Sequence, residues 1–583
     1  PFAFSAEVVV SQQNGTDATG CGRLLSPPCR SIGVGLQQCQ AGDILLIGPG
    51  HFFESSLLVT VPISIIGAGR HLTYLSCSQS QNSSSHPLEL TVPPTRPSLP
   101  PGFVVSVDEF INDWALSFIN ISFSFCGQSI TVPMPTFSSP ASGNVTVGSC
   151  SFRSCFSTLA VLNVANELGH IQIEDCVFEG NEAVSSGEHL ASIALLNSQG
   201  LSVTRCVFSS NAGGYGMLSI TTARLSMSST VFEHNTGGMG LDSSIVSVGS
   251  QYAAGTHIFR SCAWLSNTCN GCSTTLLGDS VIQFFGCTWI NNTCENPFDP
   301  IAGAALRILM SGDPLPVLVD SCTLEGNGFS GIAQMAGGAF SLTGSNGNLT
   351  ILSSIFRYNR SPTTAGAIQV GASSIVLRNT SFERNVAAKG GGGAVEIVES
   401  TQDLLVDQCR FVYNTASGPG GAMFLHSEFV SVHVVGSEWI GNRAERSTNT
   451  GSDGGAIALG VSKPSTVNNF YAADLRFIGG IWTDNHATNH GGAISYYQDN
   501  KPPTWISSAS VLFSGLTMME NTADANGGAI WIFPISAASP LRSVNSSGTS
   551  GARQLPYIQR SSDVATLAVV VQGSIFRDNH ANN

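Results

Sequence analysis

A bulky apolar residue followed three positions later by asparagine recurs along most of the chain. The pattern occurs thirteen times, and its asparagines are Asn181, Asn211, Asn235, Asn267, Asn292, Asn327, Asn359, Asn385, Asn414, Asn442, Asn485, Asn521 and Asn579. Most successive copies lie 24 to 36 residues apart, and two intervals are longer, at 43 and 58 residues. This period is typical of stacked repeats, in which each unit buries its apolar face against its neighbours.

Each repeat combines two strand patterns with two turns. A small or sulfur-bearing residue stands two positions before the bulky one, as in Cys176 and Phe178, and this spacing places both on one face of a strand. Upstream stretches such as 170–176 alternate apolar and polar residues. Downstream, a Gly-Gly-Ala-apolar element such as 392–395 predicts a tight corner where backbone approaches backbone. Each repeat is therefore predicted as strand, asparagine turn, glycine corner and strand.

Shared positions in successive repeats predict an all-β, right-handed parallel β-helix with stacked phenylalanines and an amide ladder of asparagines. A β-propeller would need four alternating strands per blade and fits less well. Near the N-terminus, Ile32, Leu36 and Cys39 lie on one helical face, which predicts a capping helix. We expect a cap and first coil in residues 1–75, early coils with Pro-rich insertions in 76–148, and regular repeats in 149–583.

The last repeat stops before its glycine corner, so we expect the natural protein to continue past residue 583, or another subunit to cover this end. The two long intervals predict surface loops that leave the coil intact. One loop would comprise residues 443–453 with 463–469, and the other residues 534–563, because composition there turns to Ser, Gly, Pro and charged residues.

At these motifs a resemblance becomes specific. The opening, with Ala41-Gly-Asp-Ile-Leu-Leu-Ile-Gly-Pro-Gly50, resembles the first coil of the pectin-lyase-like β-helix superfamily. The Phe-x-x-Asn and Gly-Gly-Ala-Ile elements resemble repeats of the polymorphic outer-membrane proteins of chlamydiae, which are also found in algal and protist surface proteins. The resemblance implies architecture and leaves activity open, because the superfamily includes lyases, hydrolases, adhesins and structural proteins.

Charged residues make up only 11% of the chain, against about 25% in ordinary domains. The net charge is −14 and no basic run occurs, which argues against nucleic acid and anionic membranes as partners. No apolar run reaches the ~20 residues of a spanning helix. We expect covalent glycans to help keep so weakly charged a surface hydrated.

The candidate glycosylation sites are the Asn-x-Ser/Thr sequons at Asn14, Asn82, Asn120, Asn144, Asn291, Asn348, Asn379 and Asn545. We expect glycans above all at Asn82, Asn144 and Asn545, which lie in predicted polar loops. The Pro-rich segment 91–102 is either a polyproline loop that carries O-linked sugars or a plain surface insertion.

The sixteen cysteines favour an oxidising compartment, extracellular or at the cell surface. Cys21 and Cys29 flank a short loop, Cys39 is placed to reach Cys77, and Cys269 and Cys294 follow motif asparagines in consecutive coils. The cysteines two positions before the bulky residues favour a column of buried thiols. Cys269-Asn-Gly-Cys272 matches a zinc or redox spacing, but without a second ligand pair it is a weak signal.

No catalytic constellation is recognisable, and we predict no cofactor or metal. Gly50-His-Phe-Phe-Glu54 is superficially similar to a pectin esterase motif whose downstream partners are absent. Glu174 and Asp175 would point to opposite faces of a strand. His486 and His490 are expected in a turn, as structural or exposed residues.

The sequence therefore favours a non-enzymatic, secreted, glycosylated structural or adhesive surface protein. It would associate with copies of itself or with another surface or filament protein. The alternative is a carbohydrate-active β-helix enzyme, a polysaccharide lyase or glycoside hydrolase. Three or more carboxylates converging in one groove would favour the enzyme, and scattered carboxylates the scaffold.

Overall fold

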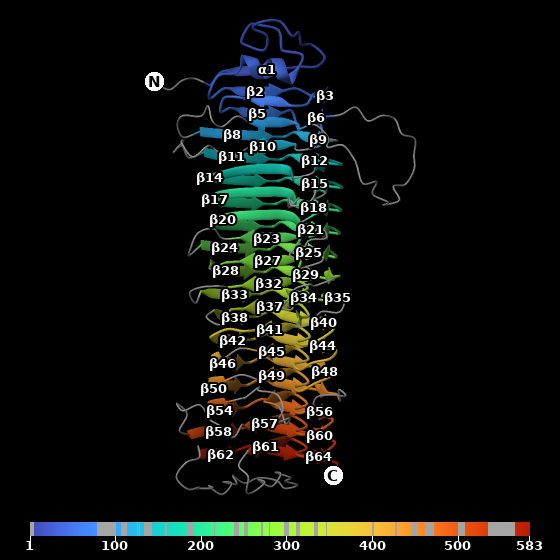
Figure 1. Ribbon diagram of the computed structural model, residues 1–583, viewed down its shortest axis with the longest axis vertical. Helices are drawn as coiled ribbons and strands as arrows, with labels where there is room; N and C mark the ends of the chain where they lie inside the picture. Colours follow the sequence, from blue (N-terminus) through green and yellow to red (C-terminus); the bar gives the residue numbers. More distant parts are fainter. Residues whose placement is uncertain are drawn as a thin grey trace, which may run out of the picture. The chain divides into compact units, whose positions relative to one another are not determined.

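The computed structural model shows two compact units, residues 1–270 and 271–583. The repeat pattern did not predict this division. It describes residues 5–77, 101–105, 114–124, 126, 129–132, 143–157, 160–183, 192–214, 216–237, 244–249, 255–269, 272–278, 280–295, 302–310, 315–330, 336–344, 347–398, 401–425, 428–445, 452–460, 471–498, 508–534 and 566–582. Each unit is a right-handed parallel β-helix, as predicted (Figure 1).

One coil of the second unit shows the plan. A leading strand, β46 (Thr401–Asp407), is followed by a motif strand, β47 (Arg410–Val412), a short strand, β48 (Thr415–Ala416), and a corner strand, β49 (Met423–Leu425). Each pairs in parallel with the corresponding strand of the preceding coil, so that Phe382 lies beside Phe411 and Val395 beside Met423. The predicted repeat is thus confirmed, with a third, short strand added after the asparagine.

The other strands of the second unit follow the same plan. The leading strands are β28 (Ser280–Phe285), β33 (Pro316–Asp320), β38 (Asn348–Leu352), β42 (Ser374–Arg378), β50 (Glu428–Val435), β54 (Tyr471–Ile478), β58 (Ser508–Ser514) and β62 (Thr566–Gln572). The motif strands are β29 (Thr288–Ile290), β34 (Thr323–Glu325), β39 (Ile355–Arg357), β43 (Ser381–Glu383), β51 (Glu438–Ile440), β55 (Ile481–Thr483), β59 (Thr517–Met519) and β63 (Ile575–Arg577). The short strands are β30 (Thr293–Cys294), β35 (Gly328–Phe329), β40 (Arg360–Ser361), β44 (Val386–Ala387), β52 (Arg443–Ala444), β56 (His486–Ala487), β60 (Thr522–Ala523) and β64 (His580–Ala581). The corner strands are β27 (Thr274–Leu277), β32 (Leu306–Leu309), β37 (Phe340–Thr343), β41 (Ile368–Val370), β45 (Val395–Ile397), β53 (Ile457–Leu459), β57 (Ile494–Gln498) and β61 (Ile530–Pro534), with β31 (Ala302–Gly303) and β36 (Ala336–Gly337) pairing beside them.

In the first unit three strands run through corner and leading positions without a break: β14 (Ala160–Glu174), β17 (Ser192–Thr204) and β20 (Gly216–Ser228). The remaining strands of the large sheet are β1 (Glu7–Val10), β2 (Ile44–Ile47), β4 (Leu57–Val59), β5 (Ser64–Gly67), β7 (Phe103–Val105), β8 (Trp114–Ile119), β10 (Ile130–Val132), β11 (Gly143–Gly148), β23 (Val246–Gly249) and β24 (Gly255–Arg260). The motif strands and their equivalents are β3 (Gly50–Phe53), β6 (Thr73–Ser76), β9 (Ser122–Ser124), β12 (Ser151–Arg153), β15 (Val177–Glu179), β18 (Val207–Ser209), β21 (Val231–Glu233) and β25 (Ala263–Leu265). The short strands are β13 (Phe156–Ser157), β16 (Glu182–Ala183), β19 (Ala212–Gly213), β22 (Thr236–Gly237) and β26 (Thr268–Cys269).

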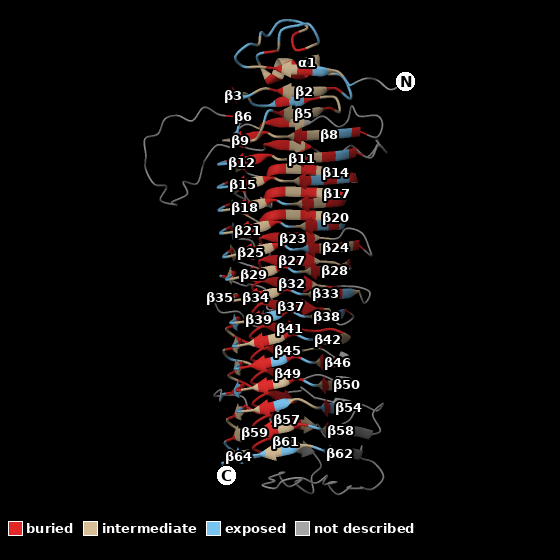
Figure 2. Ribbon diagram, turned by 180° about the vertical axis from the view of Figure 1, so that it is seen from behind, coloured by how far each residue is buried: buried red, intermediate tan, exposed pale blue. Residues whose placement is uncertain are grey.

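Buried residues recur in coil after coil of both units (Figure 2). The core of each unit is built from side chains stacked on equivalents in the next coil. In the first unit the rings of Phe178 and Phe208 lie 4.5 Å apart and within 1° of parallel. In the second, Phe356, Phe382, Phe411, Trp439 and Trp482 form an unbroken stack with centroid spacings of 4.0 to 5.1 Å. The predicted aromatic column is therefore confirmed in both units.

The asparagine ladder is also confirmed. The Asn414 side chain donates through Nδ2 to the carbonyl of Phe382, at 2.8 Å, and to Oδ1 of Asn442, at 3.0 Å. Its own Oδ1 accepts from the backbone nitrogen and from Nδ2 of Asn385, both at 3.0 Å. Every polar atom of this fully buried side chain therefore has a partner in an adjacent coil.

Two left-handed residues close the turns of each regular coil. The first follows the leading strand, as Gln408 does at φ 52°, and the second directly precedes the motif asparagine, as Tyr413 does at φ 53°. We call these the first and second turn positions. Their occupants are often serine, aspartate, asparagine or glycine, which tolerate this conformation better than bulky residues.

The glycine corner is required by space as well as by conformation. Gly420 has φ 70°, and a Cβ on Gly421 would lie 2.0 Å from the carbonyl oxygen of Gly455 in the next coil. Gly393 has the same relation to Gly421. The predicted close approach of backbone to backbone is thus confirmed, because only glycine lets the coils come this near.

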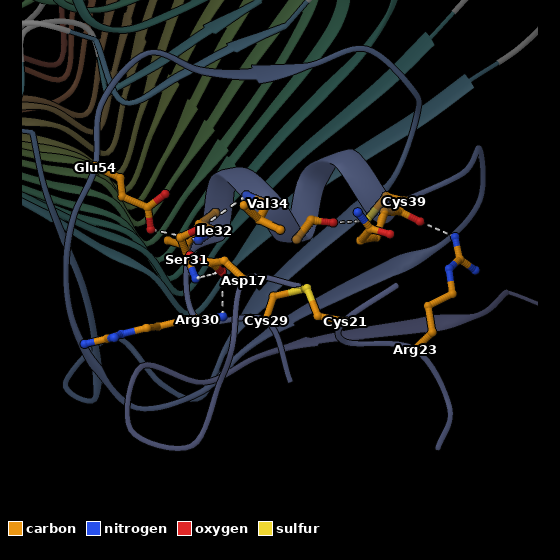
Figure 3. Close-up of a disulfide and its surroundings, with 12 residues drawn as sticks. Asp17, Cys21, Arg23, Cys29, Arg30, Ser31, Ile32, Val34, Cys39 and Glu54 are labelled. Carbon is orange, nitrogen blue, oxygen red and sulfur yellow. Dashed lines mark hydrogen bonds between the residues drawn. A yellow bond between two sulfur atoms is a disulfide. The ribbon is translucent and has the colours of Figure 1, made fainter. Parts of the chain in front are cut away.

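Helix α1 (Ile32–Gln38) caps the first coil and ends at Cys39 (Figure 3). It buries Ile32 and Leu36, and Cys39 is half-buried. The Glu54 carboxylate accepts from the backbone nitrogens of Ile32, at 2.7 Å, and Gly33, at 2.8 Å. Glu54, from the segment similar to an esterase motif, therefore caps a helix. Within the described residues, no helix has the length and apolar character that crossing a membrane requires.

The coils continue in register across both long intervals. Glu438 of β51 pairs with Ile481 of β55, and Thr517 of β59 pairs with Ile575 of β63. The asparagine ladder also continues across these intervals, since Asn442 donates to Asn485 and Asn521 donates to Asn579. The predicted loops themselves, and the Pro-rich segment, lie largely outside the described residues.

Candidate functional site

A polar network lies on the outward face of three leading strands in the second unit. Asp474 of β54 accepts from Arg476 on the same strand, at 2.8 Å, and from Ser510 of β58, at 3.0 Å. His433 of β50 shares a hydrogen bond of 3.2 Å with the same carboxylate. Sequence reasoning missed this cluster, because its members come from coils separated by insertions of unequal length.

The network holds Asp474 in its ionised form. Partial burial acts to raise the pKa of Asp474, but hydrogen bonds from Arg476, His433 and Ser510 outweigh it and leave that pKa below its usual value. Asp403 lies two coils away in the same column, where it bonds to Ser431. A carboxylate with three donors serves better to position its neighbours than to exchange protons.

The outward face of the motif strands carries alternating charges in successive coils. Glu325 pairs with Arg357 at 2.7 Å. Arg410 pairs with Glu383 at 3.2 Å and with Glu438 at 3.4 Å. Most carboxylates on this face are therefore matched with an arginine rather than gathered in one groove. Each such exposed pair contributes at most about 1 kcal/mol to stability.

The outward side chains of the corner strands are covered. Gln369 and Glu396 are buried and joined by a hydrogen bond of 3.2 Å, and Gln369 also donates to Thr364 at 3.1 Å. The ring of Phe424 lies over Gly391, where an added Cβ would come within 2.3 Å of it. The segments before the glycine corners thus cover this face, whereas the leading strands, the motif strands, the short strands and the turns carry exposed residues.

Two expectations about titratable residues need correction. Glu174 and Asp175 do not diverge, because Asp175 occupies a first turn position at φ 55° and both carboxylates bind Arg205. His486 lies in strand β56, not in a turn, and shares a hydrogen bond of 2.9 Å with Thr522. His490 stacks on Trp531 at 4.2 Å.

Six of these candidate glycosylation sites fall within the described residues. Asn14, Asn144, Asn291, Asn348 and Asn379 are exposed, and Asn120 is half-buried. Asn144 lies in strand β11, not in the loop that we expected, yet its side chain points outward. Asn82 and Asn545 lie outside the described residues.

The disulfides agree with the predicted pairs in one case and differ in another. Cys21 and Cys29 are bonded within the cap (Figure 3). Cys77 is bonded to Cys126, which follows the paired strand of the adjacent coil, and not to Cys39. Burial raises the pKa of the Cys39 thiol to about 11, and the thiol donates to the carbonyl of Gly35.

The remaining cysteine predictions concern the core. Cys269, Cys272 and Cys294 are buried and belong to neither disulfide. Cys176 is a buried thiol that donates to the carbonyl of Glu174, and burial raises its pKa well above the usual value. No group of three or more His, Cys, Asp or Glu in the described residues is arranged to hold a metal ion.

Residues 275–471 match the family model described as "Right handed beta helix region". No curated protein matches the sequence. Among solved structures, this one is similar to tailspike protein 3 of bacteriophage CBA120, with a TM-score of 0.28, 10% identity, and coverage of 93% of this chain and 62% of that chain. It is also similar to ORF18 of Geobacillus virus E2, with a TM-score of 0.23, 9% identity, and coverage of 81% and 61%.

A third similar structure is the PL6 family alginate lyase AlyGC, with a TM-score of 0.21, 10% identity, and coverage of 93% of this chain and 98% of that chain. The chain spans about three fifths of the length of the two viral proteins. At these scores the comparisons carry no inference about activity.

Proposed function

We propose that this chain is a non-enzymatic, secreted and glycosylated structural or adhesive surface protein. In this proposal the β-helix is a scaffold, and its exposed edges carry sugars and contact partners. The observation that carries the proposal is the arrangement of outward groups: carboxylates on the motif strands are matched with arginines, whereas five of the candidate sequon asparagines are exposed on the coil surface.

The sequon positions support a shared role. Asn120 and Asn379 both occupy a first turn position, at φ 60° and 51°. Asn144 lies five residues before the first turn position at Ser149, and Asn348 lies five residues before the one at Ser353. Glycans at these sites would leave the coil from its turns or from the start of a leading strand, where they disturb no core contact.

The two disulfides support a secreted protein at the cell surface or outside the cell, because such bonds persist in oxidising compartments. The repeats resembling those of chlamydial, algal and protist surface proteins support the same location. The partners in this proposal are copies of the chain, or another surface or filament protein.

The test is to express the chain in a secretory eukaryotic host and measure its intact mass before and after enzymatic removal of N-glycans. We expect a loss of mass that becomes smaller in Asn144→Gln and Asn379→Gln variants. Asn197→Gln, at an asparagine outside any sequon, is the matched control and should not change it. A mass that deglycosylation leaves unaltered would contradict the proposal.

Within the described residues, the pairing of His433 with Asp474 is an observation that favours the enzymatic alternative. Purified protein should therefore be incubated with alginate, polygalacturonate and neutral glucans while new reducing ends are measured. The scaffold proposal expects no release. Release that disappears in His433→Ala and Asp474→Asn variants would establish a carbohydrate-cleaving enzyme.

A further inference from the structure

Two exposed tyrosines and an arginine occupy consecutive second turn positions in the second unit. Tyr358, Arg384 and Tyr413 have φ values of 56°, 52° and 53°. They follow the motif strands β39, β43 and β47, which pair in register, so the three side chains form one column. Tyr358 and Tyr413 keep 51% and 49% of their surface exposed. We call this column the tyrosine ladder.

Tyrosine is an unfavourable choice at this position for stability alone. A bulky residue in the left-handed region is a conformational outlier, and a ring that stays half-exposed gains only part of the burial energy that a core position would give. The neighbouring coil provides room for the ring: at Gly441, the next second turn position, an added Cβ would lie 2.3 Å from Tyr413. The backbone is thus shaped to hold an exposed ring in place.

Arg384 is fixed between the two rings. Its Cζ atom lies 5.8 Å from the ring centroids of both Tyr358 and Tyr413, and its Nη1 is 3.4 Å from the Tyr358 hydroxyl. Within the described part of the chain, its guanidinium forms no ion pair. The adjacent Arg357 and Arg410 both pair with carboxylates. The ladder therefore presents an exposed, positioned cation that no carboxylate neutralises, on a chain of net charge −14.

We propose that the tyrosine ladder binds an acidic polysaccharide, with Arg384 pairing with a carboxylate or sulfate group and the exposed parts of the tyrosine rings and their hydroxyls contacting the sugar rings. Arginine matches the planar geometry of carboxylates, and tyrosine offers an apolar face with a polar tip. The two tyrosines are two coils apart, about 10 Å along the axis. This straight row of repeated contacts suits a linear polymer of rings. The site deepens the proposed adhesive function and rests on it.

A protein partner fits this surface less well. The core of a protein interface is apolar and depleted of charge. The ladder instead borders the paired charges Glu383, Arg410 and Glu438.

The test uses the whole chain and three named polymers: polygalacturonate, which carries carboxylates, dextran sulfate, which carries sulfates, and uncharged dextran. Affinity is measured by calorimetry at low and at physiological salt. We expect binding to one or both anionic polymers, weakened by salt, and none to dextran. The two anionic probes identify which acidic group the site prefers.

Arg384→Gln and the double variant Tyr358→Ala, Tyr413→Ala should each weaken binding about three- to tenfold. Arg378→Gln is the matched control, because it removes one surface cation that is already paired with Asp407. It should bind like the wild type. Arg384→Lys should recover only part of the affinity, since an ammonium lacks the planar fork. Unchanged thermal unfolding shows that each variant is folded.

Equal binding by the wild type and both ladder variants would overturn the inference. Failure to bind both polygalacturonate and dextran sulfate would also overturn it. This holds even if the ladder retains a protein from cell-surface extracts. Cleavage of polygalacturonate by the wild type would refute the non-enzymatic proposal. It would leave this site standing if Arg384→Gln still weakens binding.

Discussion

At the scale of single residues, the turn asparagine is needed because its side chain forms four hydrogen bonds, and a polar side chain alone would not be enough. A side chain with two donors and an oxygen of two lone pairs can link three successive coils at once, as Asn414 does. Aspartate lacks the donors and serine lacks the reach. The asparagine is therefore required by the coil, although an isolated turn would accept several residues.

Asn414→Ala should lower the free energy of unfolding by about 3–5 kcal/mol, because it leaves buried groups of Asn385, Phe382 and Asn442 without partners. Asn414→Asp, which preserves shape but removes both donors, should also be strongly destabilising. Asn348→Ala is the control, since Asn348 is exposed at the start of strand β38, and it should cost less than about 1 kcal/mol. Urea denaturation measures both free energies of unfolding. Equal effects of the two alanine variants would contradict the structural role given to the asparagine ladder.

At the scale of elements, the cap is held by carboxylates that bind backbone. Asp17 accepts from the backbone nitrogens of Arg30 and Ser31, both at 2.9 Å, just before α1, and Glu54 binds the first turn of the helix. Slight burial acts to raise the pKa of Asp17, but these hydrogen bonds lower it below 3.8 overall. A seven-residue helix is too short to be stable alone, so such contacts locate it.

The cap should therefore loosen in acid. Because the folded-state pKa of Asp17 is depressed, its stabilising effect is complete above its unfolded value of 3.8 and is lost as pH falls through the lower, folded-state value. Hydrogen exchange in residues 30–38 should accelerate at pH 3 relative to pH 6, after correction for intrinsic rates. In Asp17→Asn this pH dependence should shrink. A cap whose protection is the same at both pH values would refute the role given to Asp17.

At the scale of the whole molecule, coil and insertion are separable. The second unit keeps its register from β59 to β63 although 58 residues separate Asn521 from Asn579. Regular coils pass from corner to leading strand in few residues, as between β45 and β46. Long insertions are tolerated because closing a longer loop adds little entropy cost.

Residues 535–565, between β61 and β62, should therefore be replaceable by a short Gly-Ser linker without loss of the fold. We expect a change in the free energy of unfolding below about 2 kcal/mol, measured by denaturant titration, because the strand pairs on both sides remain. In the destabilising control, a Gly-Ser segment of five residues replaces residues 575–579 and so removes the motif strand β63. Aggregation of the first variant but not of the control would show that the insertion belongs to the folding unit.

The amino-acid sequence determined the repeat, the buried columns and the glycine corners, because each follows from contacts between identical positions of adjacent coils. Phe382 stacks on Phe411 and Gly393 faces Gly421 wherever the register is kept, so local spacing was enough to predict them. It also placed the sequons, but not their outward positions on strands and turns. Only the tertiary structure decided which unlike residues meet: Cys77 with Cys126, Asp474 with His433, and Arg384 with two tyrosines. The physical reason is that insertions of unequal length hide the register between unlike side chains, and left-handed turns redirect residues such as Asp175 that an extended strand would place elsewhere.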